Sequence, residues 1–156
     1  EKDIELKILP QKAAFICDNI TLITSLIEGK FPDYKMVIPK ETNFNILISK
    51  ERFLETIKSL APFLTGDLQK LYIGFGENKM TAYTEESELG KGETEMEIEF
   101  SGTPFEIAFN YRFLLDIMSC IQESEFWLKV FDPEKPSIFM GKDNDNFLFV
   151  TVPMKK

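Results

Sequence analysis

The feature that most constrains the fold of this chain is an internal repeat. Residues 46–57 and 107–118 match in residue class at a constant offset of 61 positions. The matched pairs are Ile46/Ile107, Ile48/Phe109, Ser49/Asn110, Phe53/Leu114, Leu54/Leu115, Glu55/Asp116, Ile57/Met118 and Leu60/Ile121. Ser49 and Asn110 are residue types that cap helix starts, and apolar residues at helical spacing follow each of them. Each copy therefore predicts a strand followed by a helix.

Three more strands are predicted after each helix. They cover residues 71–75, 79–83 and 93–100 in the first copy, and 126–131, 137–140 and 147–152 in the second. Asn78 and Asp132-Pro133 fall at the intervening hairpin turns. Chance similarity of two amphipathic helices is the alternative, but the strand order repeats as well. The expected fold class is α+β, a pseudo-twofold repeat of strand-helix-strand-strand-strand with antiparallel sheets packed on helices.

Residues 1–39 lie outside the repeat. Period-two alternation predicts strands at 4–8, 14–17 and 20–27, with no helix to cover their apolar face. Such a sheet needs a further layer, so the chain is expected to begin inside a domain. Gly29, Pro32 and Pro39 indicate a connector. We therefore expect two regions, residues 1–39 and residues 40–156.

Composition excludes most enzyme classes. The chain has 44% hydrophobic residues, enough for one sizeable core, and no apolar run of about 18 residues that would span a membrane. It contains no His, the commonest general base and zinc ligand. No glycine-rich phosphate loop or nucleophile–base pair is present, so no catalytic site, metal or cofactor is expected.

The acidic residues and the cysteines are the remaining candidates for metal binding or thiol chemistry. Asp143, Asp145 and the glutamates of 93–99 could bind Mg²⁺, but residues 142–146 lack the Gly and Glu of a calcium loop and predict a hairpin turn. Cys17 and Cys120 lie among apolar residues, which predicts buried thiols in a reducing, cytoplasmic location. The net charge of −8 argues by itself against direct nucleic-acid binding.

The last predicted strand, residues 147–152, is apolar on both faces. Phe147 and Phe149 are expected to fill the core, which leaves Leu148, Val150 and Val152 on the other face. That face is either covered by another element or forms an exposed patch that binds a partner. The residues alone leave both possibilities open.

Three segments resemble bacterial DNA sliding clamps, the beta subunits of the replicative polymerase. Residues 26–34 (LIEGKFPDY), followed by Val37-Ile38-Pro39, resemble the linker between the second and third clamp domains. Residues 150–156 (VTVPMKK) resemble the closing segment of the family, and residues 109–116 (FNYRFLLD) resemble the start of its last helix. The segments occur in the family's order and at about its spacing. The resemblance covers essentially the whole chain.

The resemblance implies an architecture and a non-enzymatic function. Such clamps are head-to-tail dimers of three-domain chains, with outer sheets and inner helices around a central hole for duplex DNA. Residues 1–39 would be the end of the middle domain and residues 40–156 the third domain, so the chain would be a fragment. Its implied partners are the replicative polymerase, other proteins with short linear motifs, the clamp loader and duplex DNA held without sequence specificity.

The resemblance also implies site residues. The family's groove binds short peptides that carry a glutamine and terminal hydrophobic residues. The matching positions are Pro32, Val37, Asn110, Phe113, Ser137, Val150, Val152, Pro153, Met154 and Lys155. The family often has Tyr where this chain has Phe113, so a hydroxyl contact would be lost. The wall that the early middle domain provides is absent from this chain, which would weaken binding.

The remaining implied contacts are with DNA and with a second subunit. The first helix, expected at residues 50–61, would bury Phe53, Leu54, Ile57, Leu60 and Ala61. The DNA-facing residues would be Lys50, Arg52, Lys58, Tyr111 and Arg112, and the dimer contact would be Phe63 with Leu64. Without the partner domain, the fragment is not expected to close a native ring. A solvated helix face, ordinary core packing and a protein-interaction module without a DNA role remain the alternatives.

Overall fold

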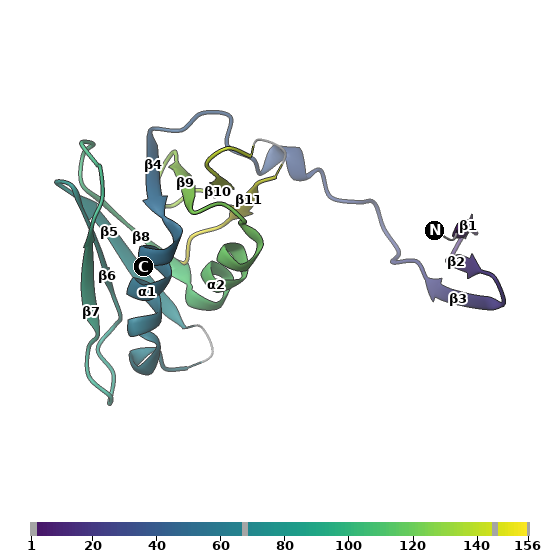
Figure 1. Cartoon of the computed structure of the whole chain (residues 1–156), viewed down its shortest axis with the longest axis horizontal. Helices are drawn as coiled ribbons and strands as arrows, with labels where there is room; N and C mark the ends of the chain where they lie inside the picture. Colours follow the sequence, from purple (N-terminus) through teal and green to yellow (C-terminus); the bar gives the residue numbers. More distant parts are fainter. Residues whose placement is uncertain (1–2, 67–68, 145–146, 156) are drawn as a thin grey trace. The chain divides into compact units, whose positions relative to one another are not determined.

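The computed structural model describes residues 3–66, 69–144 and 147–155, and the chain divides into two compact units (Figure 1). The units are Glu1–Asp33 and Tyr34–Lys156. The break between them falls inside the predicted connector.

The first unit is a three-stranded antiparallel sheet in the order β1-β2-β3. Its strands are β1 (Glu5–Ile8), β2 (Lys12–Cys17) and β3 (Ile20–Ser25), which confirms the three predicted strands. The register places Leu6, Phe15 and Leu22 next to one another on one face. All three are exposed, and among the described residues of this unit only Ala13 and Ala14 are buried apolar side chains. The sheet therefore has an apolar face that its own residues leave uncovered.

The second unit contains both copies of the predicted repeat. A short 3-10 helix, η1 (Tyr34–Met36), precedes the first copy, and a second, η2 (Ala61–Phe63), follows its helix. The first copy comprises β4 (Phe44–Ser49), α1 (Lys50–Ser59), β5 (Lys70–Gly76), β6 (Lys79–Tyr83) and β7 (Glu93–Glu97). The second comprises β8 (Phe105–Asn110), α2 (Tyr111–Cys120), β9 (Glu125–Val130), β10 (Ser137–Gly141) and β11 (Phe149–Thr151). The strand and helix that open each copy keep the offset of 61 residues at both ends.

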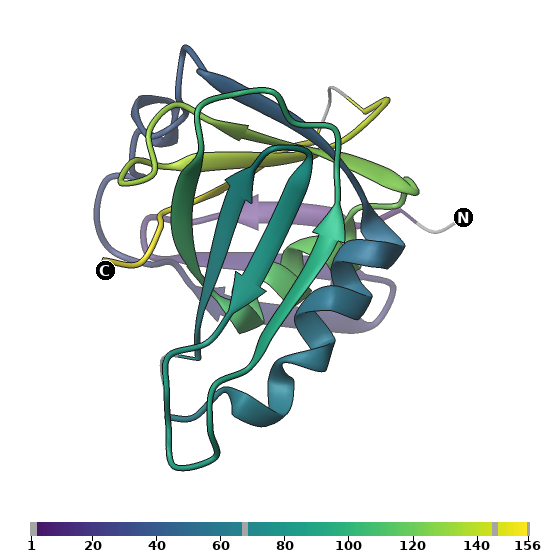
Figure 2. The same cartoon turned by 90° about the vertical axis from the view of Figure 1, so that its left-hand side faces the viewer.

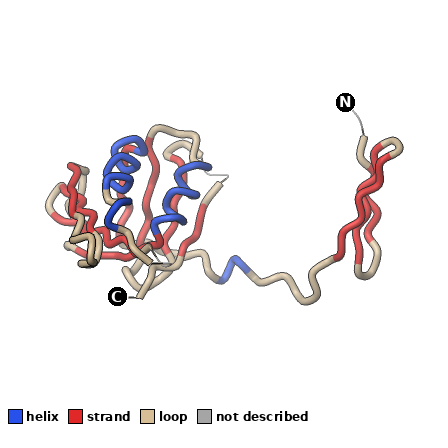
Figure 3. Tube along the Cα trace, turned by 90° about the horizontal axis from the view of Figure 1, so that it is seen from below, coloured by secondary structure: helices blue, strands red, loops and turns tan. Residues whose placement is uncertain are grey.

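The two copies exchange their first strands. The sheet orders are β11-β10-β9-β4 and β7-β6-β5-β8, so each sheet takes one edge strand from the other copy. Figure 2 shows α1 beside the sheet that ends in β7, and Figure 3 shows both helices flanked by strands. Because each sheet needs a strand from both copies, the repeat forms one core rather than two.

Aromatic side chains fill this shared core. Phe44 and Phe105, which occupy equivalent positions in the two copies, stack with their ring centroids 4.5 Å apart. Phe75 stacks on Phe105 at 4.9 Å. A second contact joins helix to sheet, where Phe53 of α1 meets Phe126 of β9 at 5.2 Å. Each fully buried side chain of this size contributes about 1.5–3 kcal/mol to stability.

Two of the strands predicted in the second unit are shorter than expected. The strand predicted at 93–100 ends at Glu97. Beyond it, the amide of Ile98 donates to the carbonyl oxygen of Asn78 at 3.0 Å, and the amide of Phe100 donates to the side-chain oxygen of Asn78 at 3.2 Å. The strand predicted at 147–152 is paired only over Phe149–Thr151. Asp145 and the second half of the predicted turn at 142–146 lie outside the described residues.

Several expectations about single residues were wrong. Ser49 is at the N-cap of α1, but its side chain makes no capping hydrogen bond, whereas Asn110 caps α2 as predicted. Ala61 is exposed, because α1 ends before it and η2 begins there. Cys120 is exposed and Cys17 only half-buried.

In the part of the chain that is described, no helix is long and apolar enough to span a membrane.

Candidate functional site

An apolar groove lies between the start of the second unit and its last strand. Its volume is about 570 Å³. The lining residues are Tyr34, Val37, Ile38, Phe147, Leu148, Val150 and Val152. In η1 the amide of Val37 donates to the carbonyl oxygen of Tyr34 at 3.1 Å, the hydrogen bond of a 3-10 turn, so the two side chains point to the same side.

The register of β11 decides which of its side chains reach the groove. Phe149 pairs with Phe139, which is fully buried, and Phe149 packs against the core. Val150 is the next residue and therefore points to the opposite face, toward the groove. Val152 is 63% exposed. Phe147 was expected in the core, but it is 40% exposed and lines the groove instead.

The tail after β11 runs to the other sheet. The amide of Met154 donates to the carbonyl oxygen of Ala108 in β8 at 2.8 Å. Two residues farther along β8, the side chain of Asn110 accepts hydrogen bonds from the amides of Arg112 and Phe113. Phe113 is exposed, Met154 and Pro153 are half-buried, and Lys155 is exposed. The tail is thus tied to β8, the strand that leads into α2.

The structure therefore places some of the predicted groove residues in the groove and others outside it. Val37, Val150 and Val152 line the apolar groove, while Asn110, Phe113, Pro153, Met154 and Lys155 are not among its lining residues. Ser137 is fully buried, and its hydroxyl oxygen has no hydrogen-bond partner. Pro32 belongs to the first unit. Tyr34 and Ile38 were missed, because residue spacing does not show which segment lies beside β11.

Comparison with known proteins decides the family. Residues 35–155 match the family model described as DNA polymerase III beta subunit, C-terminal domain. The chain belongs to this family. The match covers the whole repeat and every lining residue of the groove except Tyr34.

Individual clamps agree with the assignment. The chain is 33% identical over 144 residues to the beta sliding clamp of Chlamydia pneumoniae, covering 92% of this chain and 39% of that protein. It is 26% identical over 152 residues to the clamp of Caulobacter vibrioides, covering 97% and 41%. The solved beta sliding clamp of Caulobacter crescentus superimposes with a TM-score of 0.89 at 25% identity, covering 98% of this chain and 41% of that one. The chain thus spans about two fifths of the length of these relatives.

The helix faces of this clamp domain carry balanced charge. Arg52 and Lys58 of α1 are exposed as predicted, but so are Glu51 and Glu55. The ammonium group of Lys50 donates to the carbonyl oxygen of Ile121, which ties it to the end of α2.

The two predicted DNA-facing residues of α2 differ from each other. Arg112 is exposed and donates from Nε to the side chain of Gln69 at 3.0 Å. Tyr111 is only 8% exposed and belongs to the core, so we leave it out of the DNA-facing set.

The predicted dimer contact of the clamp domain lies beside a hollow that shares no lining residue with the groove. Phe63 and Leu64 are half-buried and line a hollow of about 350 Å³ together with Thr84 and Glu85. Leu64 packs against the core. A methyl group on Gly92 would lie only 2.6 Å from Cδ2 of Phe63, so the chain just before β7 passes directly under this ring.

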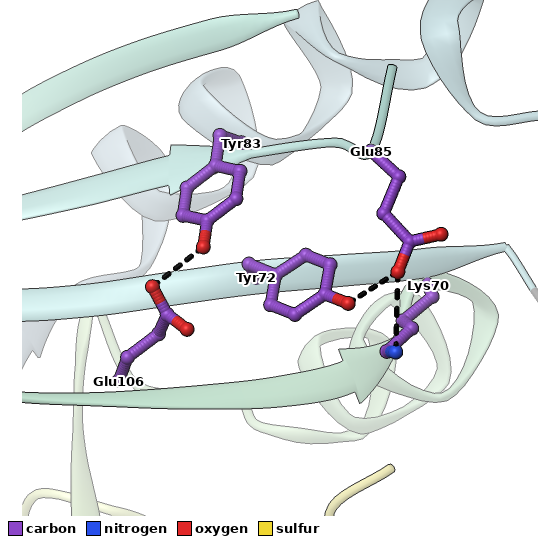
Figure 4. Close-up of polar contacts among 5 residues, drawn as sticks. All are labelled: Lys70, Tyr72, Tyr83, Glu85 and Glu106. Carbon is purple, nitrogen blue, oxygen red and sulfur yellow. Dashed lines mark hydrogen bonds and ion pairs between the residues drawn. The ribbon is translucent and has the colours of Figure 1, made fainter. Parts of the chain in front are cut away.

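A polar network that the sequence did not predict covers the sheet of β5 and β6 (Figure 4). The rings of Tyr72 and Tyr83 stack at 5.0 Å. The hydroxyl of Tyr72 and the ammonium group of Lys70 both donate to Glu85, and the Tyr83 hydroxyl donates to Glu106 at 2.5 Å.

These contacts, together with burial, shift pKa values in the network, including those of Glu85 and Tyr83. The Tyr72 hydroxyl, and then Lys70, lower the pKa of Glu85. Burial, and then the hydrogen bond to Glu106, raise the pKa of Tyr83. The network is satisfied internally. Within the described residues, no group of three or more acidic or cysteine side chains is placed to hold a metal ion.

Proposed function

We propose that this chain is the C-terminal part of a sliding clamp, a non-catalytic processivity factor that encircles duplex DNA and tethers the replicative polymerase. Residues 1–39 would end the middle domain, and residues 40–156 would form the third. The uncovered apolar face of the first unit supports the first assignment, because Leu6, Phe15 and Leu22 need a covering layer. The family match over residues 35–155 supports the second.

The groove is the proposed attachment point for short peptide motifs of the polymerase, the clamp loader and other clamp-binding proteins. The observation that carries this proposal is that Val150 of β11 and Val152, just after this strand, line an open apolar hollow. Burying two or three peptide side chains there yields roughly 1.5–3 kcal/mol each. Ordering a flexible peptide costs several kcal/mol, so the expected net affinity is about micromolar. Such binding permits exchange between partners.

DNA contact is proposed to be weak and independent of sequence. Arg52 and Lys58 can reach phosphates, but Glu51 and Glu55 on the same helix oppose them. A complete clamp would hold DNA by closing a ring around it, with Phe63 and Leu64 at the contact between subunits.

The balanced helix charge is also compatible with a protein-interaction module that has no DNA role. Retention of the full-length protein on circular DNA, and its release when the circle is cut, would distinguish the clamp from that module.

Two matched variants test the groove. Val152→Asp places a carboxylate in the groove, and Leu89→Asp places one on the loop between β6 and β7; both positions are 63% exposed in the structure. We expect Val152→Asp to weaken binding of a fluorescent clamp-binding peptide at least about tenfold in an anisotropy titration. Leu89→Asp should bind as the unmodified chain does. Equal affinity of all three proteins would remove the groove from the proposal.

A further inference from the structure

A second hollow adjoins the groove on the other side of the connector. Its volume is about 450 Å³, within the usual range of ligand pockets. Val37 and Ile38 line both hollows, so this short segment is their common wall. Pro136, another lining residue of the second hollow, directly precedes Ser137, which pairs with Thr151 beside Val152. A chain that lies in the groove can therefore continue into the second hollow.

The second hollow combines apolar surface with positive charge. Phe131 and Pro136 provide apolar surface, and Lys40, Lys135 and Glu41 are its charged lining residues. The ammonium group of Lys135 lies 4.7 Å from the ring centroid of Phe131, a cation–π contact that holds the charge over the hollow. Among the described residues, neither Lys40 nor Lys135 has an ion-pair partner.

Two lysines and one carboxylate line the second hollow. Glu41 is the single carboxylate among the lining residues. The carboxylate of Asp132, in the neighbouring turn, accepts the amide of Glu134 at 2.8 Å. The lining residues alone therefore carry more positive than negative charge, on a chain whose net charge is −8.

We propose that the second hollow binds an acidic residue that flanks the hydrophobic anchor of a groove-bound peptide. This inference rests on the proposed peptide-binding function and adds a preference for peptides with an acidic flanking residue. The aliphatic part of the flanking residue would lie on Phe131 and Pro136, and its carboxylate would accept hydrogen bonds from Lys40 and Lys135. The apolar surface favours a peptide over a DNA phosphate, because a phosphodiester has no apolar part to bury there.

The test uses the 156-residue chain and two synthetic peptides. Both peptides carry the same glutamine and terminal hydrophobic residues, and they differ only in flanks of Glu or of Gln on both sides. The charge-removing variants are Lys40→Met and Lys135→Met, which keep an apolar stem of similar length. Lys35→Met is the matched control, because Lys35 is exposed in η1 but lines neither hollow.

We expect the Glu-flanked peptide to bind the unmodified chain more tightly than the Gln-flanked peptide. Each hollow variant should weaken the Glu-flanked peptide about threefold, and the double variant about tenfold. The Gln-flanked peptide should be unaffected by either substitution, and Lys35→Met should change neither peptide. Added salt should reduce the preference for the Glu-flanked peptide.

Four other outcomes have distinct meanings. Equal weakening of both peptides by the lysine variants would overturn the proposal, because it would indicate a loss of packing rather than of charge pairing. Loss of affinity for a DNA duplex, with peptide binding unchanged, would also overturn it and assign the lysines to DNA. If Val152→Asp affects neither peptide, the groove itself fails; if it weakens both while the lysine variants change nothing, only the acidic preference fails.

Discussion

The amide of Met154 donates a hydrogen bond of 2.8 Å to the carbonyl oxygen of Ala108, and this bond joins the C-terminal tail to β8. β11 and β8 belong to different sheets, so the tail spans the two sheets. Val152 lies between β11, which ends at Thr151, and this bond. The position of this groove residue therefore depends on an anchor outside its own sheet.

Replacing the donor should weaken both the anchor and the groove. Met154→Pro removes the amide hydrogen and leaves the carbonyl oxygen of Ala108, which is 1% exposed, without this partner. We expect a loss of about 1–3 kcal/mol in unfolding free energy and weaker binding of a groove peptide. Met154→Leu keeps the amide and serves as the control in the same denaturation and titration experiments. Unchanged peptide affinity in the proline variant would show that the tail does not position Val152.

The absence of a side chain at Gly92 leaves room for Phe63, a residue of the predicted dimer contact. A Cβ atom there would lie 2.6 Å from Phe63 and 2.9 Å from Leu60, so Gly92→Ala must displace a side chain. We expect a loss of roughly 1–3 kcal/mol in stability, measured by chemical denaturation. Gly76→Ala is the control, because a Cβ atom at Gly76 meets nothing within 4 Å. Two variants of equal stability would contradict the close packing of Phe63 on Gly92.

The sequence predicted the repeat because its period appears in both residue class and cap position. Its offset predicted that the segments of Phe44 and Phe105 are equivalent, but not that these rings stack, since stacking follows from the exchange of β4 and β8 between sheets. Strand exchange is a long-range pairing that local periodicity does not encode. The same limit explains Phe147, whose alternation indicated the core, although no ladder extends that far along β11.

The candidate site was predicted in part for related reasons. Val150 and Val152 could be assigned from the two apolar faces of their strand. Tyr34 and Ile38 required knowledge of which segment covers β11, and the network of Tyr72 and Glu85 required knowledge of the cross-strand neighbours.

Two buried hydroxyl groups should respond in opposite ways to removal. The Ser137 hydroxyl is buried without a partner, so Ser137→Ala should raise stability by up to about 1–2 kcal/mol and leave peptide binding unchanged. The Thr84 hydroxyl accepts the amide of Gly92 at 3.0 Å, so Thr84→Val should lower stability by about 1–3 kcal/mol. Thermal unfolding of both variants checks the contrast. Reduced peptide affinity in Ser137→Ala would instead support the groove role predicted for Ser137.

Tyr83 should make the fold sensitive to alkaline pH. Burial and the hydrogen bond to Glu106 raise the pKa of Tyr83 above the value of about 10 that a tyrosine has in an unfolded chain. The folded chain therefore keeps a proton that the unfolded chain releases. The stability from this group is fully present below about pH 10 and is lost as the pH rises toward the folded pKa.

Tyr83→Phe removes this titration and isolates its contribution. Unfolding free energies of both proteins, measured by denaturant titration from about pH 8 to about pH 11, should converge at the alkaline end. The unmodified chain should lose at most about 1.4 kcal/mol per pH unit more than the variant, because one proton is involved. A constant difference across this range would mean that the folded and unfolded chains release the Tyr83 proton at the same pH. In that case the hydrogen bond to Glu106 would not raise the pKa of Tyr83 in the folded chain.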